Sequence, residues 1–290
     1  MCRAFEEVAR ESARDAEYQK AVRAAKKMLA LGQLNLETIA ECTELSLDEV
    51  KALADKKFEV WYQPKFNSHT GKIVGSEALI RWRADDGSLI SPGRFIPLFE
   101  KNGNIIRLDE YVFREVCRQQ KEWQKEGIQI LPVSVNISRF SLYYSNVVEK
   151  YERIINYYDV DHKYVQIEIT ESAIIENTVI VELIQKFHDA GFDILLDDFG
   201  SGYSSLASLN QMPFDTIKLD KSLVDYVGNE NGEKLLKFIV QLVQSLGMKI
   251  TAEGVEYKEQ LDFLENLNCD DIQGFYFSKP LMLADFSAKL

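Results

Sequence analysis

Short apolar segments alternate with amphipathic ones along the chain from residue 58 onward. The apolar segments have the length of strands, and between them apolar residues recur every three or four positions, as at Val179, Leu183, Ile184 and Phe187. This alternation is typical of a barrel or a doubly wound sheet. Eight strands are predicted, at residues 58–66, 73–82, 130–137, 165–170, 193–197, 216–219, 249–252 and 272–277.

The connections between these segments carry further signals. Gly127, Gly191 and Gly247 each stand directly before a predicted strand, where glycine commonly ends the preceding helix. Only residues 67–72 separate the first two strands. That connection is too short for a helical crossover, so we expect an antiparallel hairpin there.

Residues 1–55 follow a different pattern, with helical periodicity and no strand-like segment. Ser46 followed by Glu49 matches a capping box, and the segment has a helix-turn-helix-like pattern. It holds eight Lys and Arg against eleven Asp and Glu, a net charge of −3, which disfavours DNA binding. We therefore predict a helical segment at 1–55, of unknown role, followed by a barrel domain at 56–290.

Charge and composition narrow the possible functions. The net charge of −12 makes a general affinity for nucleic acids unexpected, because such binding depends on Lys and Arg. No apolar run approaches the roughly 18 residues that cross a bilayer, and the N-terminus lacks a signal-peptide pattern, so a cytoplasmic protein without a membrane partner is expected. The four cysteines are scattered, which suggests neither zinc nor redox chemistry.

Acidic residues stand at or near the ends of several predicted strands, where an unpartnered charge is costly. They are Glu77, Glu168, Asp197, Asp198 and Glu253. In a (β/α)8 barrel such strand ends converge on one face, so these carboxylates would repel one another unless cations were bound. Oxygen ligands without nearby His or Cys favour Mg²⁺ or Mn²⁺, and Asn136 adds an amide oxygen at the end of the third strand.

Seven segments in order carry a family resemblance: GSEALIRW, VSVNIS, EITES, DDFGSGYSSL, IKLDKSLV, TAEGVE and QGFYFSKP. Together they resemble the EAL family of cyclic di-GMP phosphodiesterases over almost all of residues 58–282. The resemblance implies an α/β fold, a TIM-type (β/α)8 barrel with an antiparallel first strand pair, here preceded by a small N-terminal helical segment. It also implies cyclic di-GMP as substrate, a homodimer, and a loop at 199–205 that couples metal binding to dimerisation.

The resemblance also assigns roles to individual residues. One metal ion would be held by Glu77, Asn136, Glu168 and Asp197, and a second by Asp197, Asp198 and Glu253. Two such ions, Mg²⁺ or Mn²⁺, activate a water for in-line attack on phosphorus. Lys218 would contact that water or a phosphate oxygen, Asp220 would orient it, and either Lys218 or Glu253 would be the general base. Gln63, Arg81 and Gln273 would contact substrate, while Glu171 and Glu256 would support the loop after Asp198 and the nearby ligands.

Each of these residues has an alternative structural explanation. Arg81 could form a surface salt bridge, Lys218 could cap a strand, and Asp197 with Asp198 could form a solvated turn. The chain departs from the family pattern at none of the metal ligands, so hydrolysis of cyclic di-GMP to linear pGpG is expected. The alternative function is a receptor that binds the nucleotide without turnover and signals through the N-terminal helices.

Overall fold

The computed structural model describes residues 36–43, 57–84, 86–144, 146–175, 179–201 and 213–290, with five further positions between 20 and 28. The chain divides into two compact units. The smaller unit comprises Met1–Glu59 and Arg81–Pro92, and the larger comprises Val60–Ile80 and Gly93–Leu290. The predicted capping box at Ser46 and Glu49 and most of the predicted coupling loop lie outside the described residues.

In the smaller unit, helix α2 (Leu36–Thr43) buries Ile39 and Ala40. The unit also holds the start of β1 (Phe58–Asn67), the end of β2 (Ile73–Arg83) and β3 (Leu89–Ile90). β3 pairs antiparallel with the last two residues of β2. The sequence did not predict β3, because two residues are too few to show a strand periodicity.

Eight strands close into a barrel, as predicted, and β3 adds a ninth at the edge of β2. The order around the ring is β1, β9 (Asp271–Gln273), β8 (Lys249–Glu253), β7 (Thr216–Leu219), β6 (Ile194–Phe199), β5 (Val165–Thr170), β4 (Val133–Asn136) and β2. Pairing of β1 with β2 closes the ring. β2 and β4 to β9 run parallel, whereas β1 is antiparallel to β9, which confirms the TIM-type barrel with a reversed first strand.

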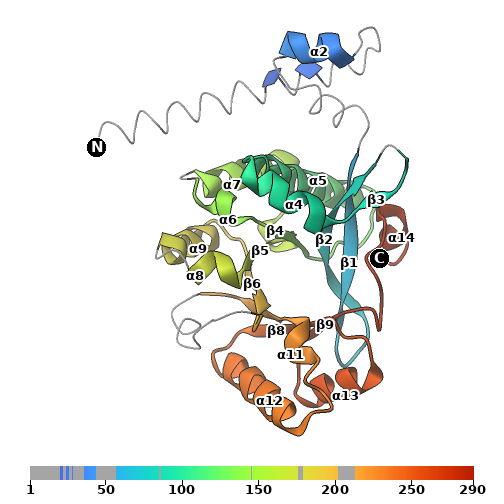
Figure 1. The fold of residues 1–290 in the computed structure, drawn as a ribbon, viewed down its shortest axis with the longest axis vertical. Helices are drawn as coiled ribbons and strands as arrows, with labels where there is room; N and C mark the ends of the chain where they lie inside the picture. The colour runs from blue at the N-terminus through green and yellow to red at the C-terminus, as the bar shows by residue number, and fades with distance from the viewer. Residues whose placement is uncertain are drawn as a thin grey trace. The chain divides into compact units, whose positions relative to one another are not determined.

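Helices cover the outside of the barrel (Figure 1). They are α4 (Pro92–Lys101), α5 (Ile105–Lys125), α6 (Arg139–Leu142), α7 (Val147–Tyr158), α8 (Glu171–Ile175), α9 (Val179–Asp189), α11 (Lys221–Val224), α12 (Glu230–Ser245), α13 (Lys258–Asn266) and α14 (Leu283–Ser287), with a 3-10 turn at His162–Tyr164. Among the described helices, none is both long and apolar enough to cross a lipid bilayer. Their inner faces supply the apolar core; Phe113 of α5, for example, contacts Tyr151 of α7 with ring centroids 4.4 Å apart.

Most of the predicted ends of helices and strands agree with the structure, and the end of the last strand differs because of a close contact between distant segments. Gly127, Gly191 and Gly247 all adopt positive φ after a helix, as their positions predicted. The last strand ends at Gln273 rather than at residue 277. Gly274 passes so close to the backbone of Val255 that a Cβ there would collide with it, and the chain then turns, with Phe277 N donating to Gly274 O.

The inside of the barrel is polar, in contrast to the branched apolar layers that fill most TIM barrels. Buried polar and charged residues from all eight barrel strands occupy it: Lys65, Glu77, Ser134, Glu168, Asp197, Lys218, Thr251 and Gln273. Apolar side chains that alternate with them, such as Val135, Ile167 and Ile217, are fully buried. The core therefore lies between strands and helices, and the interior of the barrel holds the charged groups.

Candidate metal centre

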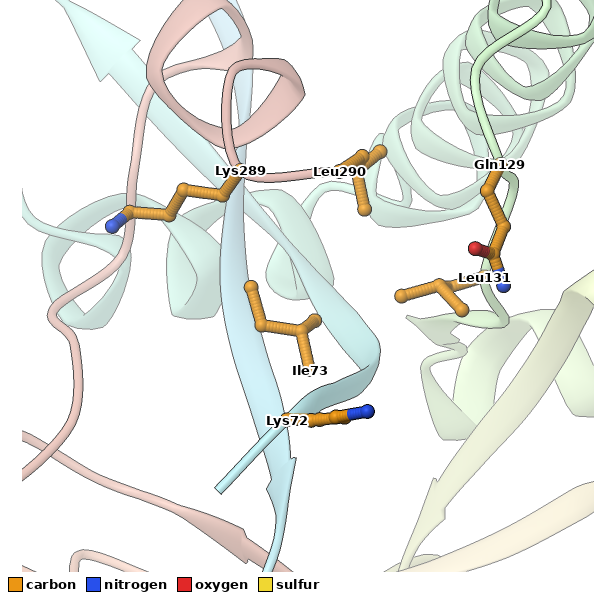
Figure 2. A pocket seen from close by; sticks show the side chains of 6 residues that line it. All are labelled: Lys72, Ile73, Gln129, Leu131, Lys289 and Leu290. Atoms are coloured by element: carbon orange, nitrogen blue, oxygen red, sulfur yellow. The ribbon is translucent and has the colours of Figure 1, made fainter. Parts of the chain in front are cut away.

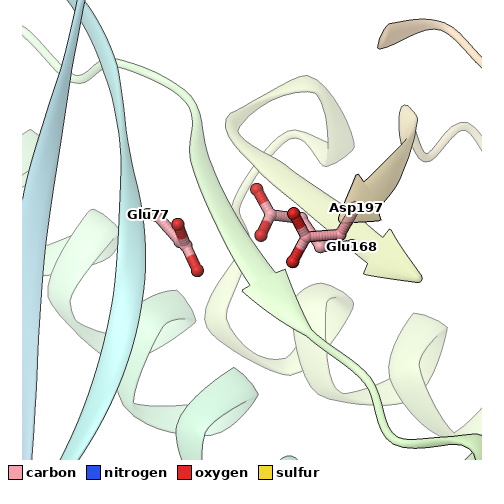
Figure 3. Close-up of side chains that lie close together, drawn as sticks. All are labelled: Glu77, Glu168 and Asp197. Atoms are coloured by element: carbon pink, nitrogen blue, oxygen red, sulfur yellow. The ribbon is translucent and has the colours of Figure 1, made fainter. Parts of the chain in front are cut away.

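Three carboxylates from separate strands meet inside the barrel. Strand β4 lies between β2 and β5 and pairs Ser134 with Glu77 and Asn136 with Glu168, so the partners of the two glutamates stand two residues apart on β4, on the same face. One oxygen from each of Glu77, Glu168 and Asp197 lies within 4.8 Å of the others, and all three residues are buried. Figure 3 shows the three carboxylates gathered in one region of the barrel. We call them the first triad.

A second triad shares Asp197 and adds Asp198 and Glu253, again with one oxygen each within 4.8 Å. Consecutive residues of a regular strand face opposite ways, so Asp197 and Asp198 could not both join the site without a distortion. The pairing of β6 with β7 shifts register between Leu196 and Phe199, and Asp198 adopts φ of 57°. This bulge brings both side chains into the site at some cost in backbone strain.

Lys218 of β7 lies among the carboxylates of both triads. Its Nζ is 2.8 Å from Glu168 Oε2 and Glu253 Oε1, 2.9 Å from Asp197 Oδ1 and 3.2 Å from Glu77 Oε2. The side chain is almost wholly buried. Burial alone would lower the pKa of Lys218, but these carboxylates outweigh it and raise that pKa well above 10.5. Lys218 is therefore an ammonium ion at neutral pH.

Lys65 of β1 is a second buried cation, which sequence reasoning missed. Its Nζ lies 2.8 Å from Ser134 Oγ and 3.0 Å from Glu168 Oε1. A signal was present: Lys65 stands two residues after Gln63, and strand alternation places both on one face. The predicted strand at 58–66 contained it as an ordinary polar position.

Two ammonium groups do not neutralise five carboxylates, and the pKa values reflect the imbalance. Burial would raise the pKa of Glu168, but Lys218 and Lys65 lower it to about 2. Burial and the repulsion of Asp197 and Glu77 raise the pKa of Glu253 to about 8 against the opposing pull of Lys218. Burial and neighbouring acids also raise the pKa values of Glu77, Asp197 and Asp198.

The donor set fits hard divalent cations. Asn136 Nδ2 donates to Glu77 Oε1 at 2.8 Å and Gln273 Nε2 donates to Glu77 Oε2 at 2.6 Å, so both amides face the first triad. One buried oxygen, Gln273 Oε1, accepts no hydrogen bond from any described residue. Crowded carboxylates with raised pKa values, beside an acceptor that lacks a donor, form an arrangement that oxygen-liganded cations would stabilise.

The other predicted residues are placed less directly. Glu171 is buried and accepts a hydrogen bond from Gly200 N at 2.9 Å, in the loop that follows Asp198. Asp220 caps α11, its Oδ1 accepting from Ser222 N at 2.9 Å, and its charge raises the pKa of Asp198. Glu256 pairs with Lys221 at 2.8 Å. None of the contacts described for Glu256 reaches either triad.

Two predicted substrate contacts lie on the first strands. Gln63 is partly buried on β1, on the face that carries Lys65. Arg81 is partly buried on β2, four residues after Glu77, and belongs to the smaller unit. A separate pocket of about 240 Å³ is lined by Lys72, Ile73, Gln129, Leu131, Lys289 and Leu290 (Figure 2). None of the predicted site residues lines this pocket. We therefore take the two carboxylate triads as the candidate functional site.

Residues 48–280 match a family model described as the EAL domain. Among similar proteins, the oxygen sensor protein DosP of Escherichia coli is 37% identical over 233 residues, which cover 80% of this chain and 29% of DosP. The cyclic di-GMP phosphodiesterase NbdA of Pseudomonas aeruginosa is 35% identical over 245 residues, covering 83% of this chain and 31% of NbdA. The chain thus spans about a third of the length of these relatives.

Solved structures show the same architecture. PaMucR phosphodiesterase in a c-di-GMP complex superposes with a TM-score of 0.77 at 32% identity, covering 82% of this chain and 98% of that one. The EAL enzyme Bd1971, bound to cAMP and cyclic di-GMP, gives the same TM-score at 27% identity and covers 83% and 66% of the two chains.

Proposed function

Because the chain belongs to the EAL domain family, we propose that it is a metal-dependent phosphodiesterase that hydrolyses cyclic di-GMP to linear pGpG. Relatives named cyclic di-GMP phosphodiesterases, such as NbdA and PdeR, support the activity. The observation that carries the proposal is the group of five carboxylates, three of them buried and two partly buried, which outnumber the two ammonium groups beside them. This excess of negative charge would attract divalent cations. Once bound, the cations would offset the negative charge of the carboxylates and of an anionic phosphodiester, as metal-assisted phosphoryl transfer requires.

Two divalent ions, Mg²⁺ or Mn²⁺, are assigned to the two triads. The first triad and Asn136 would hold one ion, and Asp198 with Glu253 would hold the other, with Asp197 shared between them. When bound, such ions lower the pKa of an attacking water and offset the charge on the phosphate. The amide of Asn136 lies beside the first triad, its Nδ2 donating to Glu77 Oε1 at 2.8 Å.

The protein's own residues then divide the remaining tasks. Lys218 remains charged, so its role is to stabilise negative charge and not to accept a proton. Glu253, which belongs to the second triad and lies 2.8 Å from Lys218 Nζ, is the group we assign as proton acceptor. Asp220 would orient the water, since it lies close enough to Asp198 to raise its pKa. Gln63, Arg81 and Gln273 remain the proposed contacts to the nucleotide.

The proposal is tested by incubating the purified chain with cyclic di-GMP in Mn²⁺ or in EDTA and identifying the product chromatographically. Linear pGpG should form in Mn²⁺ and not in EDTA. Glu77→Ala should abolish turnover, whereas Glu259→Ala, an exposed glutamate on α13, should leave it unchanged. Tight binding of cyclic di-GMP in Mn²⁺ without turnover would reject the enzyme and leave the receptor function instead.

We further propose that the chain forms a homodimer through α12. Leu235 and Phe238 lie on the outer face of this helix and are 47% and 57% exposed. Exposed large apolar residues three positions apart form a helical stripe that a second copy could cover. Sedimentation of Phe238→Glu should give a lighter species than the wild type, and equal masses would refute this interface.

The division of the chain into a helical segment at residues 1–55 and a barrel domain at 56–290 stays a prediction.

A further inference from the structure

Lys65 is a buried charge to which the proposed mechanism gives no task. Its side chain is 5% exposed, and it reaches into the barrel from β1, the barrel strand that is antiparallel to β9. A lysine so buried is costly unless its ammonium is paired and hydrogen bonded. Here both conditions are met, by Glu168 Oε1 at 3.0 Å and Ser134 Oγ at 2.8 Å.

Glu168 differs from the other carboxylates in how its two oxygens are held. Oε1 accepts from Lys65 and Oε2 accepts from Lys218, so an ammonium group holds each oxygen. Its side chain is fully buried. Rotation of this carboxylate would break one of two charge-assisted hydrogen bonds, which are roughly twice as strong as neutral ones. The orientation of Glu168 is thus fixed before any ion binds.

Ser134 completes the support of Lys65. Its Oγ accepts from Lys65 Nζ and also lies 3.3 Å from Ser76 O, to which it donates. Ser134 is fully buried on β4, the strand between those that carry Glu77 and Glu168. Lys65 is therefore held in place from two sides and cannot swing away from Glu168 without leaving its own charge unpaired.

We propose that Lys65 is a positioning residue for the metal centre. It presents Glu168 to the first metal ion in one orientation, and its positive charge limits how tightly that ion is bound. The inference rests on the proposed function for the effect on turnover, but its effect on metal binding can be measured without nucleotide.

The two effects of removing the charge are opposite in direction. Lys65→Met keeps the length of the side chain and removes the ammonium, which makes the site more negative. Mn²⁺ should then bind more tightly, with a Kd lower by roughly three- to tenfold, because a repelling charge is lost. Turnover should fall about tenfold or more in kcat with little change in KM, because Glu168 is no longer held in one orientation.

The experiment measures the Kd for Mn²⁺ by calorimetry without nucleotide, and then kcat and KM with cyclic di-GMP. Lys65→Arg keeps the charge and should keep the wild-type Kd while recovering part of the kcat. Lys72→Met is the matched control, since Lys72 is an exposed lysine at the hairpin that joins β1 to β2. It should match the wild type in every measurement.

Lys65→Met leaves Glu168 Oε1 without its donor and could fail to fold, so Ser134→Ala serves as a second variant. It removes the hydroxyl that holds Lys65 and leaves all charges, and kcat should fall roughly threefold with an unchanged Kd for Mn²⁺. Wild-type kcat in both Lys65→Arg and Ser134→Ala would overturn the proposal. Weaker Mn²⁺ binding together with lower kcat in Lys65→Met would also overturn it, because general damage to the fold predicts that result.

Failure of the proposed function gives a different result. A wild-type chain that binds Mn²⁺ but does not hydrolyse cyclic di-GMP would refute the phosphodiesterase activity alone. The Mn²⁺ titrations of Lys65→Met and Lys65→Arg would still decide whether Lys65 limits metal affinity. A wild-type chain that binds no Mn²⁺ would refute both inferences.

Discussion

Asp109 of α5 allows a sharp test of the electrostatics away from the metal centre. It is 6% exposed, and its Oδ2 accepts hydrogen bonds from Ser138 N at 2.9 Å and Ser141 Oγ at 2.7 Å. Burial raises the pKa of Asp109 from 3.8 to about 6, even though these bonds act in the opposite direction. The contacts tie α5 to the segment that follows Asn136.

Because the pKa of Asp109 is raised in the folded chain, the free energy of unfolding depends on pH in a definite direction. Above pH 6, Asp109 is ionised in both the folded and the unfolded chain, and the folded state bears the whole cost of the buried charge. As the pH falls from about 6 to 4, the folded chain takes up the proton first, so stability rises. The rise in the pKa of Asp109 from 3.8 to about 6 corresponds to about 3 kcal/mol in the free energy of unfolding.

Asp109→Asn keeps the accepting oxygen and removes the charge. At pH 8 it should increase the free energy of unfolding by up to about 3 kcal/mol, and near pH 4 the gain should vanish. Urea unfolding in EDTA at both pH values, followed by circular dichroism, measures this difference. The exposed Asp285→Asn should change stability by less than about 0.5 kcal/mol at either pH. If Asp109→Asn proves less stable than the wild type at pH 8, the carboxylate is favourable as an anion and the reasoning is wrong.

Three further outcomes follow from the structure. Glu77→Ala should lower turnover by at least about a hundredfold, measured by product formation, while stability in EDTA stays equal or rises because repulsion is relieved. Mn²⁺ at a hundred times its Kd should stabilise the wild type by about 2.7 kcal/mol in thermal unfolding, and Asp197→Asn should lose most of this gain because Asp197 belongs to both triads. Gly274→Ala should destabilise the barrel by about 3 kcal/mol in urea unfolding, because its Cβ would collide with the backbone of Val255.

Much of the fold could be predicted because the barrel strands show a recognisable pattern in their own local sequence. Strands such as β5 and β7 carry buried apolar residues at alternate positions, and Gly127, Gly191 and Gly247 end the helices before β4, β6 and β8. Two features of the fold show no such local sequence pattern. β3 is too short to show periodicity, and the end of β9 depends on how closely Gly274 approaches Val255, a contact between segments distant in the chain.

Part of the candidate site could be predicted because acidic residues stand within otherwise apolar strands, where a charge is unexpected. Glu77, Glu168 and Asp197 interrupt apolar strands, and the structure brings them together. The bulge that turns Asp198 into the site could not be predicted, because its register shift arises between two strands. Lys65 was missed for a related reason, since its partners Glu168 and Ser134 stand 103 and 69 residues away.

The polar interior explains why this barrel can hold a metal centre at all. Five carboxylates at one end of a closed sheet would oppose folding if they were left to repel one another. Lys218 and Lys65 offset part of that repulsion from within the barrel, and Asn136 and Gln273 add hydrogen bonds to Glu77. The protein's own charges therefore suffice to assemble the site but not to neutralise it. The residual negative charge is the property that favours binding of divalent cations, and substitutions that add positive charge should improve stability at the expense of metal affinity.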